Sequence, residues 1–425
     1  MKNNLLILSL LLFLLSSCER NEDSKQPDFI QFAKKEINFG YKESKDTIEI
    51  QTNTSWEIES IPEWLTVSKQ KGTQEDTNVI LYIQPNRNET AREFELIFKI
   101  KDKKQALHIY QEAKPKPEYT LPRLGFTSLI RLVNGTYSET EPFDLEFESD
   151  KLFINSSNKE LIFLGSLFVG KLTNYPKLDR VETAGYTYNQ LPIIIGNFIN
   201  FTIEENYTPS YETYQKIEKE GIDKFNSDAS FPLRTSDGTY YYSRRHLHCI
   251  GLYELGISLE KLLNGKSYKE ESMKHEYGLI YPVSNIRFSA DMDRPNPPLL
   301  TEKLNEDKFV PMNPNYISEI KYGNNTLLLV ESDFEKGIVN SIQSKLSKSE
   351  QLNAEEVTKA EQMDAYYIYM VSVGEFKVIK GNLIEVINQL KDPKAVKIPI
   401  VPVSFSFSDY YNNGVGAVKY KIHVQ

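Results

Sequence analysis

The chain contains little sulfur and little tryptophan. Its 425 residues include two cysteines and two tryptophans, so it can form one disulfide at most and cannot build a cysteine-rich zinc site. It also lacks an excess of basic charge, because Lys plus Arg number 50 against 59 for Asp plus Glu, giving a net charge of −9 and a pI near 5.4. Proteins that bind nucleic acid carry a basic footprint, so we expect no nucleic-acid partner.

Signatures of common enzymes are absent as well. No G-x-G-x-x-G, P-loop, H-E-x-x-H or G-x-S-x-G pattern occurs, so we expect a protein without catalytic activity or cofactor. The chain does have 40% hydrophobic and 26% charged residues, with 26 tyrosines and 22 phenylalanines. This composition is typical of globular proteins, and the length favours two or three domains.

The N-terminus carries an export signal. An apolar run from Leu5 to Leu15 has the length of a signal-peptide core and is too short to span a bilayer as a helix. It ends in Leu15-Ser16-Ser17-Cys18, which resembles a bacterial lipobox. That resemblance implies that residues 1–17 are removed and that Cys18 receives a diacylglycerol. The alternative is an ordinary secretory signal with a chance cysteine.

An acylated Cys18 would anchor the chain without a transmembrane helix, because each buried CH₂ contributes about 0.8 kcal/mol. Residues 18–27 are polar and predict a flexible tether. Their Glu19, Glu22 and Asp23 resemble the acidic tracts of surface-exported lipoproteins of the Bacteroidetes. We therefore expect a lipid-anchored protein of the outer membrane, exposed at the cell surface.

Residues 28–113 predict a small β-sandwich. Alternating runs at 47–50, 79–83, 94–100 and 107–110 are separated by turn residues. The order of several motifs resembles the BACON family, an immunoglobulin-like module of Bacteroidetes surface proteins. These motifs are Thr54-Ser55-Trp56, Pro62-Glu63-Trp64-Leu65-Thr66-Val67, Gly72, Asn86, Arg92 and Gln111.

The resemblance to the BACON family implies a carbohydrate partner, and Trp56 and Trp64 are the candidate glycan contacts. We favour the alternative that both rings fill the core of the sandwich, which would make this domain a spacer. Lys114-Pro115-Lys116-Pro117 then predicts a stiff linker over residues 114–119, because alternate prolines favour extended backbone.

Residues 120–425 predict an α+β domain with a large bent antiparallel sheet flanked by two helical clusters, since strands and helices do not alternate as in βαβ units. Strands are expected at 161–169, 198–203, 279–290, 317–331, 365–378, 398–407 and 414–424. Helices are expected at 211–225, 334–346 and 383–390.

The order of segments in this region resembles the thiol-activated, or cholesterol-dependent, cytolysins, which are related to the perforin-like (MACPF) proteins. The matching segments are the helix at 211–225, Tyr242-Ser243, Phe288-Ser289-Ala290-Asp291 before Pro295, Ile320-Lys321-Tyr322-Gly323, the run 327–332, a bend at Gly374, the helix at 383–390 and the strand at 398–404. The resemblance implies a pore-forming protein that oligomerises at a membrane, with itself or with a related partner. In that family, two helical clusters unfold into membrane-spanning β-hairpins.

Residues 246–281 have the two periodicities that such a change requires. Apolar side chains recur at every second position, whereas Leu252, Leu255, Leu259 and Leu262 form a helical stripe. An amphipathic core helix followed by a strand is the alternative. The candidate membrane-hairpin residues are Leu247, Cys249, Tyr253, Leu255, Ile257, Leu259, Met273 and Tyr277.

The second cluster has a clean helical stripe at Phe334, Ile338, Ile342 and Leu346. As a strand it would place Lys336 in lipid, at a cost of about 2–4 kcal/mol at the midplane.

The chain departs from the cytolysin pattern in several places. Val373-Gly374 stands where the family has two glycines, and Asn324 follows Tyr322-Gly323 in place of an arginine. The chain stops at Gln425 and has no tryptophan after Trp64, so we expect no cholesterol-recognition domain. A surface glycan-binding or adhesion lipoprotein without pore activity is the alternative function.

A metal site at His246, His248, Cys249 and His275 is the weaker interpretation, because converging ligands are not evident. We expect solvated histidines there and a buried Cys249 that acts as a small apolar side chain.

Overall fold

The computed structural model describes residues 27–117, 131–173, 175–197, 199–225, 237–250, 252, 255, 257, 273–292, 294–392 and 396–424. The predicted signal sequence and the predicted lipidation site Cys18 lie outside these residues. The chain divides into two compact units between Lys116 and Pro117, within the expected linker, and each unit is described by itself. Among the described residues, no helix has both the length and the apolar character needed to cross a bilayer.

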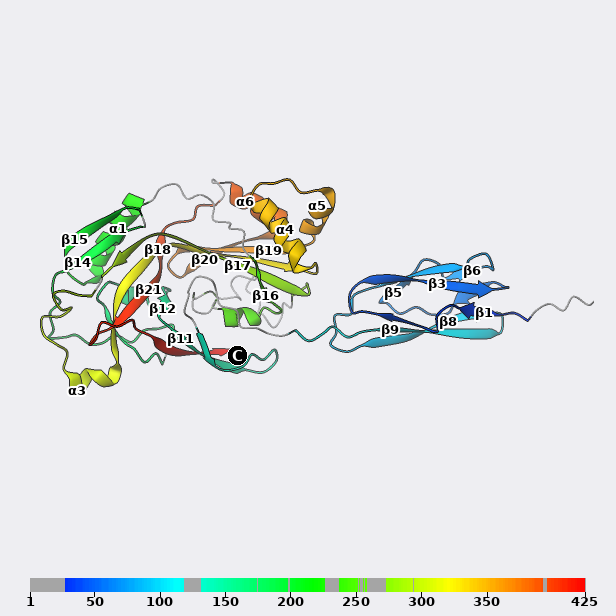
Figure 1. Cartoon of the computed structure of the whole chain (residues 1–425), viewed down its shortest axis with the longest axis horizontal. Helices are drawn as coiled ribbons and strands as arrows, with labels where there is room; N and C mark the ends of the chain where they lie inside the picture. The colour runs from blue at the N-terminus through cyan, green and yellow to red at the C-terminus, as the bar shows by residue number, and fades with distance from the viewer. Residues whose placement is uncertain are drawn as a thin grey trace, which may run out of the picture. The chain divides into compact units, whose positions relative to one another are not determined.

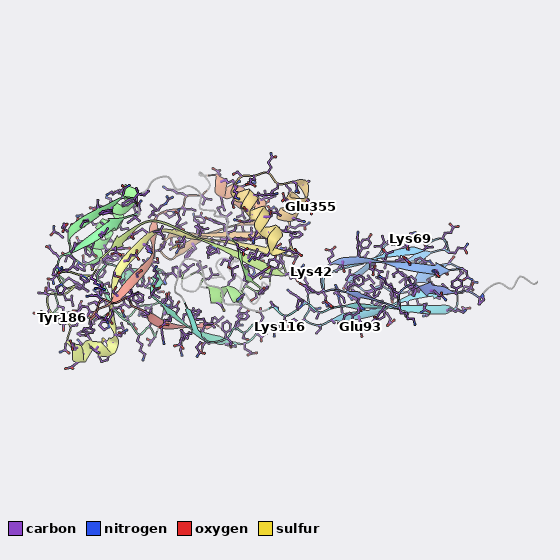
Figure 2. All side chains as sticks on the ribbon, in the orientation of Figure 1. Lys42, Lys69, Glu93, Lys116, Tyr186 and Glu355 are labelled. Atoms are coloured by element: carbon purple, nitrogen blue, oxygen red, sulfur yellow. The ribbon has the colours of Figure 1, made fainter. Side chains whose placement is uncertain are left out.

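The small unit is a β-sandwich, as the sequence predicts. One sheet has four strands in the order β1 (Ile30–Phe32), β3 (Ser44–Thr52), β7 (Asn78–Ile83) and β5 (Leu65–Val67). The other has five, in the order β2 (Glu36–Phe39), β9 (Lys103–Gln111), β8 (Arg92–Ile100), β4 (Trp56–Ile58) and β6 (Lys71–Gly72). All pairs are antiparallel except β2 with β9. Alternate side chains point inward, such as Leu96 and Phe98, while Lys69 and Glu93 project outward (Figure 2).

Trp56 is a core residue of this sandwich. It is 2% exposed, and its ring lies 5.5 Å from that of Phe98. Gly72 on β6 pairs with Trp56 across the sheet, and a Cβ atom at position 72 would lie 2.4 Å from the indole ring. The indole therefore occupies the space where a side chain would stand on the neighbouring strand.

The large unit is built on a ten-stranded sheet and a three-stranded sheet (Figure 1). The smaller sheet has the order β10 (Arg131–Asn134), β11 (Phe143–Ser149) and β22 (Val418–Val424). The main path of the larger sheet is β12 (Lys151–Phe153), β21 (Val401–Asp409), β18 (Pro314–Ser332), β17 (Tyr277–Asp291), β14 (Leu191–Gly196) and β15 (Phe201–Tyr207). The remaining strands are β13 (Leu167–Val169), β16 (Thr239–Tyr241), β19 (Asp364–Ser372) and β20 (Glu375–Asn382).

The helices of the described residues have at most 15 residues. The α-helices are α1 (Tyr211–Phe225), α3 (Glu306–Phe309), α4 (Lys336–Ser347), α5 (Ala354–Glu361) and α6 (Leu383–Lys391). The 3₁₀ helices are η1 (Lys159–Leu161), η2 (His246–Ile250) and η3 (Val310–Met312). Helix α1 has the bounds that the sequence predicts.

Several predicted strands are wrong in part. Residues 199–200, 398–400 and 414–417, which are predicted as strand, lie outside β15, β21 and β22. The segment 161–169 is not one strand. Its first residue, Leu161, ends η1, the backbone then turns at Gly165, whose φ is +82°, and β13 begins only at Leu167. The segment 365–378 is two antiparallel strands, β19 and β20. The expected bend at Gly374, with φ +79°, is the reverse turn between them.

Strand β18 bends because it changes partners halfway. Residues 315–323 pair with β21, whereas residues 326–331 pair with β19. Register shifts at Lys321/Tyr322 in β18 and Ile286/Phe288 in β17 mark the same region, and such bulges curve a sheet. At the changeover the buried Asn324 donates to the carbonyl oxygens of Met370 and Pro399, each at 3.0 Å, and accepts from the Met370 amide at 3.3 Å. Figure 1 shows the resulting curvature.

Two separate groups of helices pack on the bent sheet, one near each end of its long strands. Helix α1 packs on one end, where Tyr214 stacks on Tyr322 and Gly221 lies against the Phe288 ring. Helices α4, α5 and α6 cover the end formed by β17, β18 and β19, so the second expected cluster is confirmed (Figure 1). The first cluster falls largely outside the described residues.

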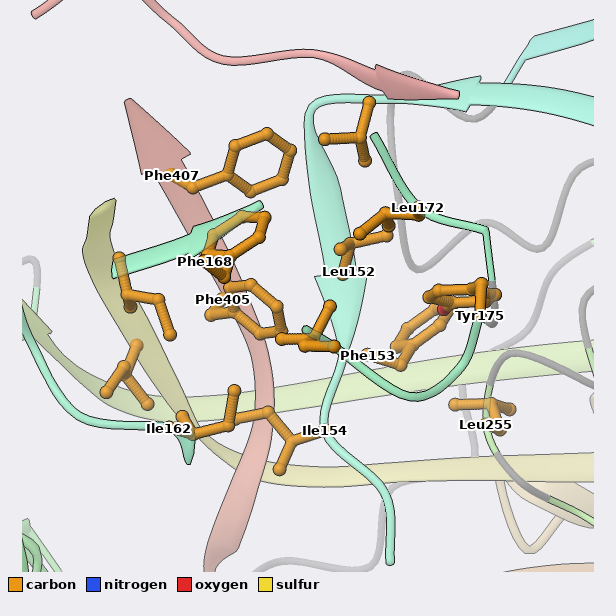
Figure 3. Packing of buried hydrophobic residues seen from close by; sticks show 14 of the residues in the cluster. Leu152, Phe153, Ile154, Ile162, Phe168, Leu172, Tyr175, Leu255, Phe405 and Phe407 are labelled. Atoms are coloured by element: carbon orange, nitrogen blue, oxygen red, sulfur yellow. The ribbon is translucent and has the colours of Figure 1, made fainter. Parts of the chain in front are cut away.

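The main core lies between the large sheet and the three-stranded sheet. Phe168 packs edge-on against Phe405 and Phe407, with ring centroids 6.2 and 5.3 Å apart (Figure 3). Leu255 belongs to the same cluster and lies below Tyr175 in this view.

Candidate functional site

Two inserts leave the large sheet at the same end of neighbouring strands. Residues 242–276 connect β16 to β17, which pair through Tyr241 and Gly278. Residues 333–363 connect β18 to β19, which pair through Glu331 and Asp364. Strands β17 and β18 are themselves antiparallel neighbours, with Tyr277 opposite Ser332. The four strands therefore lie in the order β16-β17-β18-β19. Both inserts begin and end at the same end of these strands.

The described candidate hairpin residues, in the first insert and at Tyr277 where β17 begins, contribute to the core. Leu247, Cys249, Leu255, Ile257 and Tyr277 are each less than 8% exposed, and Met273 is half-buried. Tyr253 and Leu259 lie outside the described residues.

Residues 246–250 form the 3₁₀ helix η2, so this part of the predicted alternation is not a strand in this structure. The predicted helical stripe begins after η2, and only its Leu252 and Leu255 are described. Cys249 is buried, as expected.

The second insert is helical and contacts the segment before β16. Lys336 of α4 pairs with Asp237 at 3.0 Å. Asn340 accepts from the Tyr281 hydroxyl at 2.7 Å and donates to Asp237 at 2.5 Å. A strand would place these polar residues in lipid, whereas in this structure they tie the second insert to the segment before β16 and to β17.

A buried ion pair connects the first insert to the end of β18. Nη2 of Arg244 lies 3.4 Å from Oε2 of Glu331, and both residues are at most 6% exposed. The Tyr241 hydroxyl donates to Oε1 of Glu331 at 3.4 Å, and Nη2 of Arg244 donates to the Tyr366 hydroxyl at 3.1 Å. The guanidinium also lies 5.4 Å from the Tyr366 ring centroid. Burial raises the pKa of Glu331, and the nearby Arg244 opposes that rise.

His275 makes a second link between the same strand ends. Its Nδ1 lies 3.1 Å from Asp333 and its Nε2 lies 3.6 Å from Asp364. Asp333 also accepts from the Glu276 amide at 2.7 Å. The hydrogen bond to Asp333 raises the pKa of His275, while partial burial opposes the rise. We call Tyr241, Arg244, His275, Glu331, Asp333, Asp364 and Tyr366 the strand-end network.

Of the residues in this network, only His275 is a candidate site residue from the sequence, and there as a metal ligand. One signal was available, because Glu331 follows four apolar residues in a predicted central strand. A carboxylate at such a position needs a partner. The identity of that partner was not predictable, because Arg244 is 87 residues away along the chain.

The histidines of the first insert do not form a metal site with the other described residues. No group of three or more His, Cys, Asp or Glu side chains that could hold an ion occurs among the residues given above. The expectation of solvated histidines is wrong for His246, which is fully buried between Tyr137 and Tyr242. Burial and the charge of Arg245 lower the pKa of His248 to about 4.

The candidate glycan contacts in the small unit differ in exposure. Trp56 is buried, so no face of its ring is open to a sugar. Trp64 is half-buried, and the Arg92 guanidinium lies 4.6 Å from its ring centroid.

Comparison with known proteins gives one family match and several similar solved structures. Residues 54–112 match the model of the BACON family, described as "Putative binding domain, N-terminal". No curated protein matches the chain.

Solved structures of cytolysins are similar to it at low sequence identity. Pneumolysin is 14% identical with a TM-score of 0.45, covering 72% of this chain and 71% of its own. The human-specific toxin intermedilysin is 14% identical with a TM-score of 0.46, covering 71% and 69%. Suilysin from Streptococcus suis is 14% identical with a TM-score of 0.44, covering 71% and 70%.

Proposed function

We propose that this chain is a non-enzymatic, cytolysin-like lipoprotein that oligomerises at a membrane and inserts β-hairpins to form a pore. One observation supports it above all others. Both inserts join neighbouring antiparallel strands at the same end of the sheet, so their extension would lengthen β16, β17, β18 and β19 without changing the strand order. Each insert is longer than two strands of about 9–11 residues, the length that crosses a bilayer.

The two inserts would contribute unequally to the membrane. The apolar alternation of 247–259 offers one lipid-facing row, whereas α4 offers Lys336 and Asn340 at alternate positions. Because the second insert has no apolar row of its own, the proposal includes a second copy or a related protein whose strands complete the assembly. Every strand hydrogen bond must close between neighbours in lipid, which gives the assembly its driving force.

The membrane anchor is the second part of the proposal. Acylation of Cys18 would hold the chain at the outer membrane, with residues 18–27 as a tether. Replacement of Cys18 by Ser should release the protein from the membrane fraction of the producing cell and remove the acyl mass from its N-terminal peptide.

A purified protein of residues 19–425 tests pore formation, because Cys249 is then its single cysteine. In solution the buried thiol should react slowly with a maleimide. On bacterial lipid vesicles, alone or with a related protein, we expect faster labelling, oligomers and release of trapped dye. A protein that stays monomeric, keeps Cys249 protected and releases no dye under all these conditions contradicts the proposal.

A glycan-binding or adhesion role is the second candidate, and the match of residues 54–112 to a binding-domain family favours it. The half-buried Trp64 with Arg92 is the aromatic contact that the structure leaves to such a role. Glycan-array binding that is lost in Trp64→Ala, with the sandwich still folded, would support it.

A further inference from the structure

A cavity of about 610 Å³ lies at the end of the large sheet distant from the strand-end network. It is lined by side chains of β14, β15, β17 and β18 together with the turn between β14 and β15. The lining residues are Ile194, Gly196, Asn197, Phe201, Ile286, Arg287, Phe288, Ser289, Glu319 and Lys321. Pockets of this size bind small organic ligands.

The cavity opens on the face of the sheet that α1 does not cover. Helix α1 contacts Phe288 and Tyr322, and the next residues along each strand, Ser289 and Lys321, point to the opposite face. Ser289 and Lys321 pair across β17 and β18. Helix α1 therefore does not cover the face on which Ser289 and Lys321 line the cavity.

One side of the cavity is apolar and exposed. Ile194, Phe201 and Ile286 are 43%, 64% and 39% exposed. Ile203 pairs directly with Ile194 and is 53% exposed, so it extends the apolar surface along the edge strand β15. Large apolar side chains that gather on one exposed surface mark sites of interaction.

The other side of the cavity carries positive charge with an unused donor. Arg287 lies at the register shift of β17, where Ile286 pairs with Gly323 and Phe288 with Tyr322, so Arg287 itself has no residue opposite it. Its Nη2 is buried and has no hydrogen-bond partner in the described part of the chain. A buried guanidinium N–H without an acceptor is costly. Because Arg287 also lines the cavity, a small rotation of its guanidinium would turn this N–H toward a carboxylate bound there, which is the acceptor that fits it best.

Lys321 adds a second cation near this end of the cavity. It pairs loosely with Glu319, with 3.6 Å between their charged atoms, and Ser406 donates to the other oxygen of Glu319 at 3.0 Å. The three charged lining residues therefore carry a net positive charge of one, which matches one anionic head group.

We propose that this cavity binds a free long-chain fatty acid, with its carboxylate on Arg287 and its alkyl chain along Ile194, Phe201 and Ile286. The charged donors and the apolar side chains line one open cavity, and a single-chain amphiphile offers both chemistries within one molecule. The proposal is independent of pore formation, because none of its residues belongs to an insert.

Oleate titration of purified residues 19–425 tests the head-group contact. We expect binding by calorimetry or by displacement of a fluorescent fatty acid, and at least tenfold weaker binding of methyl oleate, which lacks the charge. Arg287→Gln should weaken oleate binding at least tenfold, as loss of a charge-assisted hydrogen bond predicts. The matched control Arg180→Gln, an exposed arginine away from the cavity, should leave it unchanged.

Phe201→Ser tests the apolar side, and it should weaken oleate binding several-fold while circular dichroism remains unchanged. Val415→Ser, at an 82% exposed position elsewhere, is its control. If Arg287→Gln fails to fold, methyl oleate and Phe201→Ser decide the question. Equal affinity for oleate and its methyl ester, no effect of either cavity variant, or binding only to phosphatidylglycerol vesicles and not to free oleate would overturn the proposal.

Discussion

Replacement of Glu331 by Leu should destabilise the large unit strongly, because it leaves Arg244 as an unpaired buried cation. Arg244 is 6% exposed, and its Nε and Nη1 already lack partners among the described residues. An arginine cannot escape by losing its proton. Breaking a buried pair in this way costs about 3–5 kcal/mol, so we expect a loss of that size in the free energy of unfolding.

The reverse change, Arg244→Met, should cost less. Burial raises the pKa of Glu331, so without Arg244 the carboxyl can bind a proton and become neutral. The double variant Arg244→Met/Glu331→Leu should lie closer to the wild type than Glu331→Leu does, since replacing a buried pair by apolar residues is often neutral. The surface pair Lys216–Glu220 provides the control, and Glu220→Leu should change stability by about 0.5 kcal/mol at most.

Urea unfolding measures these effects for the two units separately. Both tryptophans lie in the small unit, so tryptophan fluorescence follows the sandwich, while far-ultraviolet circular dichroism also follows the large unit. Glu331→Leu should shift the transition of the large unit and leave the fluorescence transition in place. If Arg244→Met costs as much as Glu331→Leu, or if the two effects simply add, the pair does not stabilise the fold by the mechanism argued here.

Three further predictions concern single contacts. Because folding raises the pKa of His275 above its unfolded value of 6.5, the protonated ring stabilises the fold at low pH, and this contribution is lost as the pH rises through the folded pKa. His275→Gln should therefore lower stability more at pH 6 than at pH 8.5. An equal loss at both pH values would contradict this. Asn324→Leu should lower the unfolding free energy of the large unit by about 2–4 kcal/mol, because it leaves the Met370 and Pro399 carbonyls unpaired. Urea titrations followed by circular dichroism measure this loss. Gly72→Ala should lower the stability of the sandwich by about 1–3 kcal/mol by forcing the Trp56 ring aside, and an unchanged fluorescence transition would argue against that contact.

The elements that the sequence predicts well are those with long, regular periodicity. Helix α1 and strands β17 and β18 follow from patterns that extend over many residues. The β19–β20 hairpin was missed because a single glycine, Gly374, reverses a segment whose two sides both have strand character, an apolar run before it and an alternating run after it. Strand β16 was missed as well, since three residues carry too little pattern to identify a strand.

The candidate site was predictable only in its location. The double periodicity of 246–281 identifies the first insert, but the strand-end network depends on pairs that only the fold brings together, such as His275 with Asp333 and Asp364. Asn324 illustrates the same limit. The sequence shows it as a departure from the cytolysin pattern, whereas the structure shows that its amide satisfies two carbonyl oxygens where β18 changes partners.

The position of the strand-end network determines what must break when an insert leaves the sheet. The ladder between β17 and β18 continues to Tyr277 and Ser332, and the network lies beside these last pairs. In the proposed pore formation, release of the inserts would therefore break side-chain contacts of Arg244, His275 and Glu331 and expose groups that water can solvate, while the ladder would remain intact. It follows that Glu331→Leu should increase the maleimide reactivity of Cys249 in solution in proportion to its loss of stability. A destabilised variant whose Cys249 stays protected would separate the network from the movement of the first insert.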